Sequence, residues 1–105
     1  MQATITARRF NLDNSLREYI EGKVAKFRRF HDGIIGLEVI LGWEKASRYT
    51  KFVINVQNKQ IVIKENAEEL RESFDLALDR AVVQLKRYKD KVQEGRKSKD
   101  NFNAA

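Results

Sequence analysis

Hydrophobic and polar residues alternate at the start of the chain and then change to a helical spacing. The alternation predicts a strand over residues 2–8. The capping residues Asp13, Asn14 and Ser15 follow, and the apolar side chains after them recur at helical spacing, which predicts a helix over about 14–30. The apolar arc of this helix comprises Leu16, Tyr19, Ile20, Phe27 and Phe30.

The middle of the chain returns to alternation. It predicts a strand over 36–43 and two more around 52–56 and 61–63. If Asn58-Lys59 is a two-residue turn, the last two strands form a hairpin with all their apolar side chains on one face. This turn would pair Val56 with Ile61 and Ile54 with Ile63.

A second, longer helix closes the pattern. Asn66 as the N-cap and Glu69 three residues later mark its start, and the apolar spacing then holds for about six turns. Gly95 is a plausible C′ residue, just past the last turn of this helix. We therefore expect a single domain over residues 1–94 and a flexible basic tail over 95–105.

The order of these elements predicts an α+β fold of the type βαβββα, a four-stranded sheet with two helices packed on one face. A chain of 105 residues with 42% hydrophobic residues supports one core. With no cysteine, a disulfide scaffold and a thiolate zinc site are excluded. No apolar run approaches the length of a membrane span, so we expect neither export nor membrane insertion.

Charge changes this picture, because it is both large and unevenly placed. The net charge is +6 and the isoelectric point is about 9.7, which suits a polyanionic partner. Residues 80–99 hold eight bases against two acids, whereas residues 65–79 hold six acids against one base. The second helix is therefore predicted to be acidic at its start and basic at its end.

Three of the bases on this helix form a row. At about 100° per residue, Arg80, Arg87 and Lys91 fall within about 40° of one another. Bases near a helix C-terminus also complement the helix dipole, but one or two in the last turn suffice for that. We therefore expect the row to be a polyanion-binding face.

Lysines also interrupt the apolar arc of the first helix. Lys23 falls near its middle and Lys26 at its edge, so their side chains must extend outward, into a groove between the two helices in our interpretation. The plainer alternative is that the lysine stems cover hydrophobic surface at the helix border. Arg28 and Arg29 follow and face differently, and we interpret them as solvent-side or supporting charges. We expect the bases of both helices to converge in one concave cradle shaped for folded RNA.

The residues do not supply the parts of a catalytic site. His31 is the single histidine and is expected to be an ordinary surface residue beside a helix end. Glu68, Glu69 and Glu72 could hold a divalent metal, but acids in a first helical turn complement the helix dipole. We expect no enzymatic activity, no metal, no cofactor and no small-molecule substrate.

Aromatic residues are expected mainly in the core. This favours recognition of a nucleic-acid backbone or shape over base stacking. The aromatic residues on predicted buried stripes are Tyr19, Phe27, Phe30, Trp43, Phe52, Phe74 and Tyr88.

Several short motifs, taken in order, carry a resemblance to a known family. The helix–three strands–helix portion is similar to the double-stranded RNA-binding domain, but that domain lacks the first strand. The whole order, over about Met1–Val92, resembles the ribosome hibernation-promoting factors, also called sigma-54 modulation proteins. The motifs are Ile5-Thr6-Ala7-Arg8, Leu16-Arg17-Glu18-Tyr19, Lys23-Val24-Ala25-Lys26-Phe27 and Gln84-Leu85-Lys86-Arg87-Tyr88-Lys89-Asp90-Lys91.

The resemblance implies a cytoplasmic, ribosome-associated translation inhibitor of the short form, monomeric off the ribosome. Its partner would be the small ribosomal subunit, whose decoding groove it would occupy over the transfer RNA and messenger RNA sites during starvation or stationary phase. The implied ribosomal RNA contacts are Lys23, Lys26, Arg80, Lys86, Arg87, Lys89 and Lys91, with Arg8, Arg28 and Arg29 as secondary contacts. Arg71 and Val83 depart from the family pattern, which commonly has tyrosine and arginine there.

A second hypothesis uses the other half of the same helix. The sigma-54 name of the family fits a protein-interaction module that acts on the transcription machinery, with the acidic start of the second helix as its contact surface. Capture of RNA polymerase or a sigma factor without ribosomes would favour this alternative.

Overall fold

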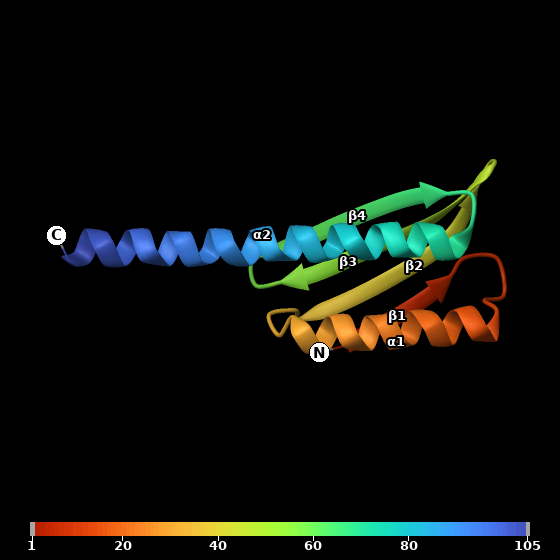
Figure 1. The fold of residues 1–105 in the computed structure, drawn as a ribbon, viewed down its shortest axis with the longest axis horizontal. Helices are drawn as coiled ribbons and strands as arrows, with labels where there is room; N and C mark the ends of the chain where they lie inside the picture. The colour runs from red at the N-terminus through yellow and green to blue at the C-terminus, as the bar shows by residue number, and fades with distance from the viewer. Residues whose placement is uncertain (1, 105) are drawn as a thin grey trace.

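The computed structural model describes the backbone of residues 2–104 and the side chains of residues 3–91. It confirms the predicted βαβββα order (Figure 1). The elements are β1 (Gln2–Ala7), α1 (Asn14–Phe30), β2 (Gly36–Glu44), β3 (Ser47–Val56), β4 (Lys59–Ala67) and α2 (Leu70–Ala104).

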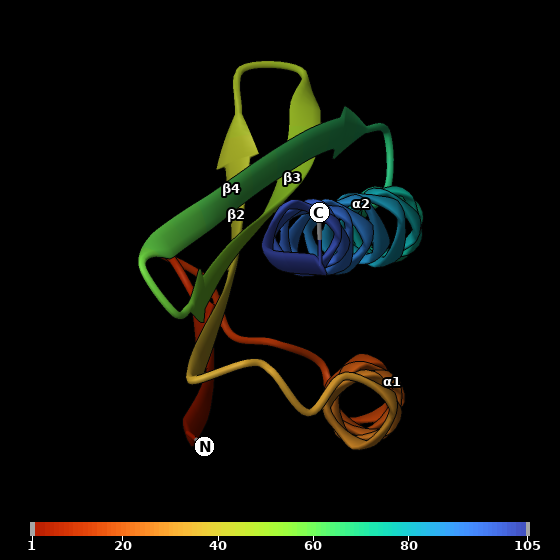
Figure 2. The same ribbon diagram turned by 90° about the vertical axis from the view of Figure 1, so that its left-hand side faces the viewer.

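The four strands form one sheet in the order β1-β2-β3-β4. β1 and β2 are parallel, so α1 is the crossover between them, and the remaining neighbours are antiparallel. Both helices lie on the same side of the sheet, as the end-on view in Figure 2 shows. The fold class expected from the sequence is therefore confirmed.

Aromatic rings join the two helices to the sheet. Phe52 on β3 is fully buried, and it meets Phe27 of α1 edge-on at 6.3 Å and Phe74 of α2 at 5.7 Å between ring centroids. Alternate residues of the strands, such as Val39 and Ile54, complete this core because their side chains point to the helix side. The core therefore fixes where each helix presents its outer side chains.

The hairpin between β3 and β4 differs from the predicted register by two residues. Ile54 pairs with Ile61 and Val56 with Lys59, so the turn is Gln57-Asn58 and the prediction of Asn58-Lys59 is wrong. Asn58 has φ 65°, a left-handed conformation that asparagine tolerates better than most residues. A two-residue shift leaves every side chain on its predicted face, because the strand repeat is two.

The start of α2 also differs from the prediction. Asn66 is not its N-cap but belongs to β4, and its side-chain amide donates hydrogen bonds to Glu44 and Ser47, at 3.1 Å in each case. This cross-strand network holds the residue in the sheet, and the helix begins at Leu70.

The helical backbone of α2 continues past Gly95 to Ala104, so the predicted helix end at Gly95 is wrong. The side chains of residues 95–105 lie outside the described residues, and a flexible tail there stays a prediction. Within the described part of the chain, no helix combines the length and hydropathy needed to cross a bilayer.

Candidate nucleic-acid interface

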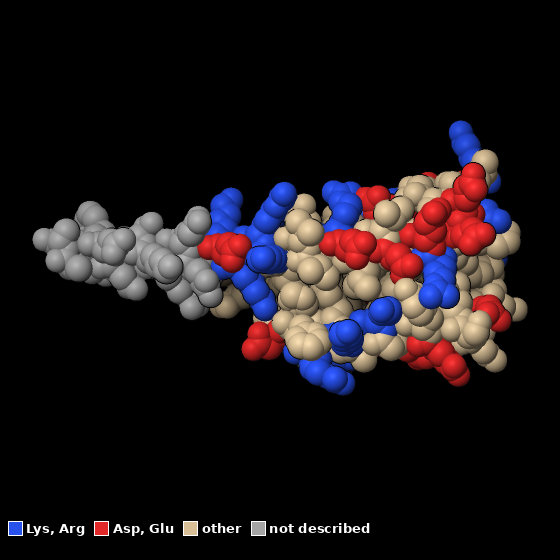
Figure 3. Space-filling view, viewed as in Figure 1, with Lys and Arg blue, Asp and Glu red and all other residues tan. Residues whose placement is uncertain are grey.

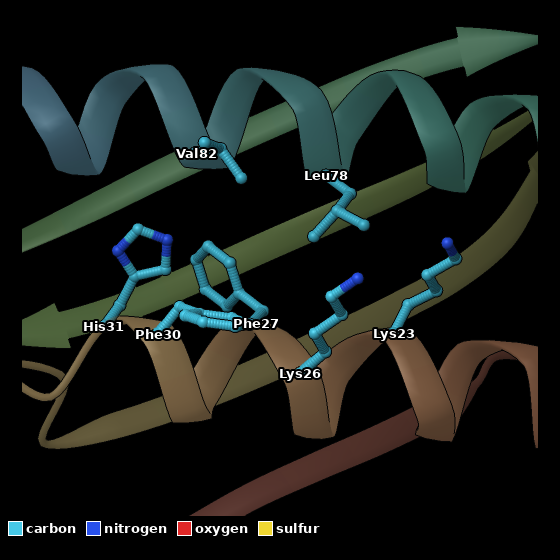
Figure 4. A pocket seen from close by; sticks show the side chains of 7 residues that line it. All are labelled: Lys23, Lys26, Phe27, Phe30, His31, Leu78 and Val82. Carbon is cyan, nitrogen blue, oxygen red and sulfur yellow. The ribbon is translucent and has the colours of Figure 1, made fainter.

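A groove runs between α1 and α2 on the outer side of the helix layer. It encloses a hollow of about 240 Å³, with side chains of both helices along its walls (Figure 4). The lining residues are Lys23, Lys26, Phe27, Phe30, His31, Leu78 and Val82. Apolar side chains form its floor and lysines its rim, so an anionic ligand with flat or apolar parts could lie in it.

The two groove lysines extend as the sequence predicts. Lys23 and Lys26 are exposed, and both point from α1 toward α2 (Figure 4). The Lys23 ammonium lies 5.6 Å from the centroid of the Tyr19 ring, within cation–π range. Neither lysine has a carboxylate partner among the described side chains, so their charge is available to a ligand.

A polar contact near the start of α2 helps to fix the spacing of the helices. The Tyr19 hydroxyl on α1 donates a 2.6 Å hydrogen bond to Asp75 on α2. This hydrogen bond is the main cause that raises the pKa of Tyr19. Arg71, at the position where the family pattern expects tyrosine, lies with its guanidinium carbon 4.0 Å from the centroid of the Tyr19 ring. Arg71 therefore joins α2 to α1 through the Tyr19 ring, and it lines the acidic hollow on α2.

A second polar contact joins α2 to the segment just after α1, next to His31. The ammonium of Lys89 on α2 lies 3.7 Å from Asp32, just after α1. His31 lies beside this pair at the end of α1, as expected, and is partly buried, with its ring 4.8 Å from that of Phe27 between centroids. Burial chiefly, and the charge of Lys89 next, lower the pKa of His31. The neutral imidazole is therefore favoured in the groove.

The row on α2 does not face the groove. Arg80 forms an ion pair with Glu65 of β4, and it lies roughly 160–200° around the helix from Leu78 and Val82. Arg87 and Lys91 fall within about 40° of Arg80 and so share its flank. The structure therefore brings Lys23 and Lys26 to the groove, leaves Lys89 beyond its His31 end in contact with Asp32, and places the row on the β4 side. This arrangement corrects the prediction of a single cradle.

The remaining predicted contacts surround these two surfaces. Lys86 is exposed on the last described turns of α2, and Arg28 and Arg29 lie in the last turn of α1. Arg8 follows β1 at the opposite end of the sheet, where it lines a separate hollow with Trp43.

Acidic and basic side chains separate along the molecule, as the sequence predicts (Figure 3). Acids gather over the first half of α2, where Glu69, Glu72, Asp75 and Asp79 line a shallow hollow. Among the described residues no set of three histidines or acids could hold a metal ion, and Glu68, Glu69 and Glu72 form no such set.

Two aromatic residues expected in the core are exposed instead. Phe30 is 65% exposed at the groove, and Trp43 is 58% exposed at the end of β2. Both occupy positions of the correct period, but each lies at an element end, beyond the reach of the opposing layer. Their positions at the ends of a predicted helix and a predicted strand are the signal that could have identified both residues as exposed.

These features define a class of small α+β proteins in which a sheet supports two helices with a cation-rimmed groove between them. The chain matches the family described as "Sigma 54 modulation protein / S30EA ribosomal protein" over residues 3–93, and it belongs to that family. Proteins of this family are not enzymes, in agreement with the sequence analysis.

Individual relatives cover nearly the whole chain. The ribosome hibernation promoting factor of Azotobacter vinelandii is 27% identical, over 96% of this chain and 97% of the relative. That of Escherichia coli K12 is also 27% identical, over 90% of this chain and 99% of the relative.

Solved structures share the fold. A ribosomal subunit interface protein from Coxiella burnetii superposes with a TM-score of 0.78 at 20% identity, over 86% of this chain and 99% of that protein. The N-terminal domain of Thermus thermophilus Protein Y gives a TM-score of 0.68 at 24% identity, over 81% of this chain and 94% of that domain.

Proposed function

We propose that the protein is a cytoplasmic, ribosome-associated translation inhibitor that acts during starvation or stationary phase. It binds small-subunit ribosomal RNA in the decoding groove and excludes transfer RNA and messenger RNA by volume and charge. The names of its relatives, ribosome hibernation promoting factors, support the ribosomal role. Such inhibition requires occupancy alone and no bond chemistry.

One observation carries the RNA-binding part of this proposal. Lys23 and Lys26 project from α1 across a groove toward α2, without carboxylate partners among the described side chains. A lysine within an apolar arc packs less well against the neighbouring helix than an apolar residue would. A charge-assisted hydrogen bond from this lysine to an RNA phosphate would compensate for the weaker packing. Lys86 and Lys89 lie about 40° and 20° around α2 from Val82 of the groove, and they would extend this surface, Lys89 after its contact with Asp32 opens.

The row on the β4 flank has a different part in the proposal. Arg87 and Lys91 would contact RNA that passes over the outer side of α2, so that the helix is held from both flanks. Arg80 joins them only if its ion pair with Glu65 opens, which costs little at an exposed pair.

Competition with transfer RNA tests the proposal. Small subunits carrying a labelled transfer RNA in the P site are mixed with the protein, and the released label is measured. We expect the wild type to displace transfer RNA and Lys23→Gln/Lys26→Gln to do so at least tenfold more weakly. The matched control is Lys51→Gln/Lys59→Gln, which removes equal charge from β3 and β4, outside the groove lining.

Two outcomes would contradict the proposal. One is release of transfer RNA that is equal in both double variants and the wild type, and the other is no release at all. Capture of a sigma factor without ribosomes from nuclease-treated lysate would instead favour the transcription hypothesis, which the names of the relatives do not support.

A further inference from the structure

Trp43, the single tryptophan of the chain, lies at the end of β2 in an aromatic stack open to solvent. Phe10, from the segment between β1 and α1, stacks on it at 5.7 Å between centroids with the rings 25° apart. The guanidinium of Arg48, its cross-strand partner on β3, lies 4.1 Å from the Trp43 ring centroid. The fold therefore surrounds the exposed Trp43 ring with a stacked ring and a guanidinium group.

Arginine charge surrounds this stack. Arg8 and Arg9 are exposed and line one hollow with Trp43 and Tyr49. Ion pairs among the described side chains involve Lys64, Arg80 and Lys89, so Arg8, Arg9 and Arg48 lack a carboxylate partner there.

One acid, Glu44, also lines the hollow, but it is already engaged. It forms an ion pair with Lys64 and accepts a hydrogen bond from Asn66, and these two contacts lower its pKa. The net charge around the hollow is therefore positive, and Arg8, Arg9 and Arg48 supply it.

The stack is held in place before any ligand arrives. The backbone N–H of Arg8 donates a 2.9 Å hydrogen bond to the carbonyl of Leu41, which ties the segment carrying Phe10 to β2. Arg48 and Trp43 are paired within the sheet ladder. A preorganised site loses little conformational entropy on binding.

We propose that Phe10, Trp43 and Arg48, with Arg8 and Arg9, form a second RNA site that holds a single-stranded segment. A base would extend the stack, and the flanking phosphates would pair with Arg8 and Arg9. The site is separate from the groove, because the hollow beside Trp43 and the groove share no lining residue.

A protein partner is the weaker interpretation of the same surface. The centres of protein interfaces are depleted of charge, whereas here the two rings lie among arginines. Stacked rings beside arginines are the usual means of holding single-stranded RNA.

The position of Trp43 makes the test direct, because the tryptophan fluorescence of the intact protein reports on this site alone. The probe is hexaadenylate RNA, and a polyphosphate of six units is the base-free comparison. We expect hexaadenylate to quench the fluorescence and to bind at least tenfold more tightly than polyphosphate.

Variants test whether the arginines of this site hold the RNA. Arg8→Gln/Arg9→Gln should weaken hexaadenylate binding about tenfold. The control Lys51→Gln/Lys59→Gln, which removes equal charge from β3 and β4 outside both RNA sites, should leave it within twofold of wild type. With fluorescein-labelled hexaadenylate, Trp43→Leu should lose about tenfold in affinity and Trp43→Phe should recover most of it, because phenylalanine keeps a ring for stacking.

The inference fails if quenching is absent, if polyphosphate binds as well as RNA, or if the arginine variant binds like wild type. A lysate partner that binds through Trp43 and resists nuclease would also overturn it. The inference rests on the proposed function only in taking RNA as the ligand. If hexaadenylate binds as expected while small subunits do not bind the protein, the proposed function fails and this site stands.

Discussion

At the scale of single residues, one buried hydroxyl pair ties α2 to the middle of the sheet. Thr50 on β3 and Ser73 on α2 are both fully buried, with 2.8 Å between their side-chain oxygens. The Ser73 hydroxyl donates to the carbonyl of Leu70 at 2.7 Å. Because that hydrogen bond uses its one proton, Thr50 must donate to Ser73.

The assignment of Thr50 as donor predicts an asymmetric mutational response. Ser73→Ala leaves a buried donor without an acceptor, so the free energy of unfolding should fall by about 1–3 kcal/mol. Thr50→Val/Ser73→Ala removes both polar groups and should cost less than Ser73→Ala alone. Urea unfolding measures both, and a double variant less stable than the single one would contradict the assignment.

His31 provides a second prediction at this scale, because it is the only histidine and its proton NMR signal needs no assignment. Burial and Lys89 lower its pKa below the ordinary value of 6.5. The folded state then binds fewer protons than the unfolded state, so stability contributed by neutral His31 is lost as pH falls below 6.5 toward the folded pKa.

We expect the titration midpoint of His31 below 6.5, and a higher midpoint in Lys89→Gln because the neighbouring positive charge is removed. In His31→Gln the unfolding free energy should lose part of its decline on acidification. A midpoint at or above 6.5 in the wild type would show that the ring is not desolvated as the structure places it.

At the scale of elements, two glycines have opposite surroundings. A Cβ at Gly22 on α1 would meet nothing within 4 Å, whereas one at Gly42 on β2 would lie 2.6 Å from the ring of Tyr49, its partner on β3. Gly22 therefore costs helix stability without a steric reason, and Gly42 is required for the close approach of the Tyr49 ring.

Alanine at each position should change stability in opposite directions. Gly22→Ala should raise the unfolding free energy by about 0.5–1 kcal/mol through helix propensity. Gly42→Ala should lower it by about 1–3 kcal/mol, because the buried Tyr49 ring must move. Thermal unfolding followed by circular dichroism provides the comparison, and an unchanged stability for Gly42→Ala would contradict the packing.

Periodicity predicted the elements because burial on one face imposes a repeat of 2 or 3.6 along the chain. It could not predict how elements end. Asn66 is a residue type that often caps helices, yet its side-chain amide donates hydrogen bonds to Glu44 and Ser47 across the sheet. Long-range polar contacts of this kind, like the turn that Asn58 adopts, leave no local pattern in the sequence.

The candidate site was predictable to a similar degree. Lys23 and Lys26 could be identified because they interrupt an apolar arc, and the structure places them at the groove. The direction of the Arg80 row could not be predicted, because a helical wheel gives positions relative to one another and not the neighbour each flank faces. The ion pair of Arg80 with Glu65 depends on β4 lying beside α2.

At the scale of the whole molecule, charge is arranged along its length as well as between its faces. The acids of α2 lie toward its first turns, and the bases of its described part gather further along the helix, on the side of the C-terminal half of α1 (Figure 3). Such a distribution orients an approaching polyanion toward the basic half and repels it from the acidic one. The long-range field that orients the RNA and the lysine contacts at the groove then favour the same bound position of the RNA.

The most direct test of the central claim is the salt dependence of affinity for purified small subunits, measured by sedimentation. Each lysine that neutralises a phosphate adds roughly 0.7–0.9 to the slope of log affinity against log salt. The wild type should show a steep decline, and Lys23→Gln/Lys26→Gln should bind more weakly with a slope smaller by roughly 1.4–1.8. Equal affinity and equal slope in the wild type and this variant would show that the groove lysines do not hold RNA.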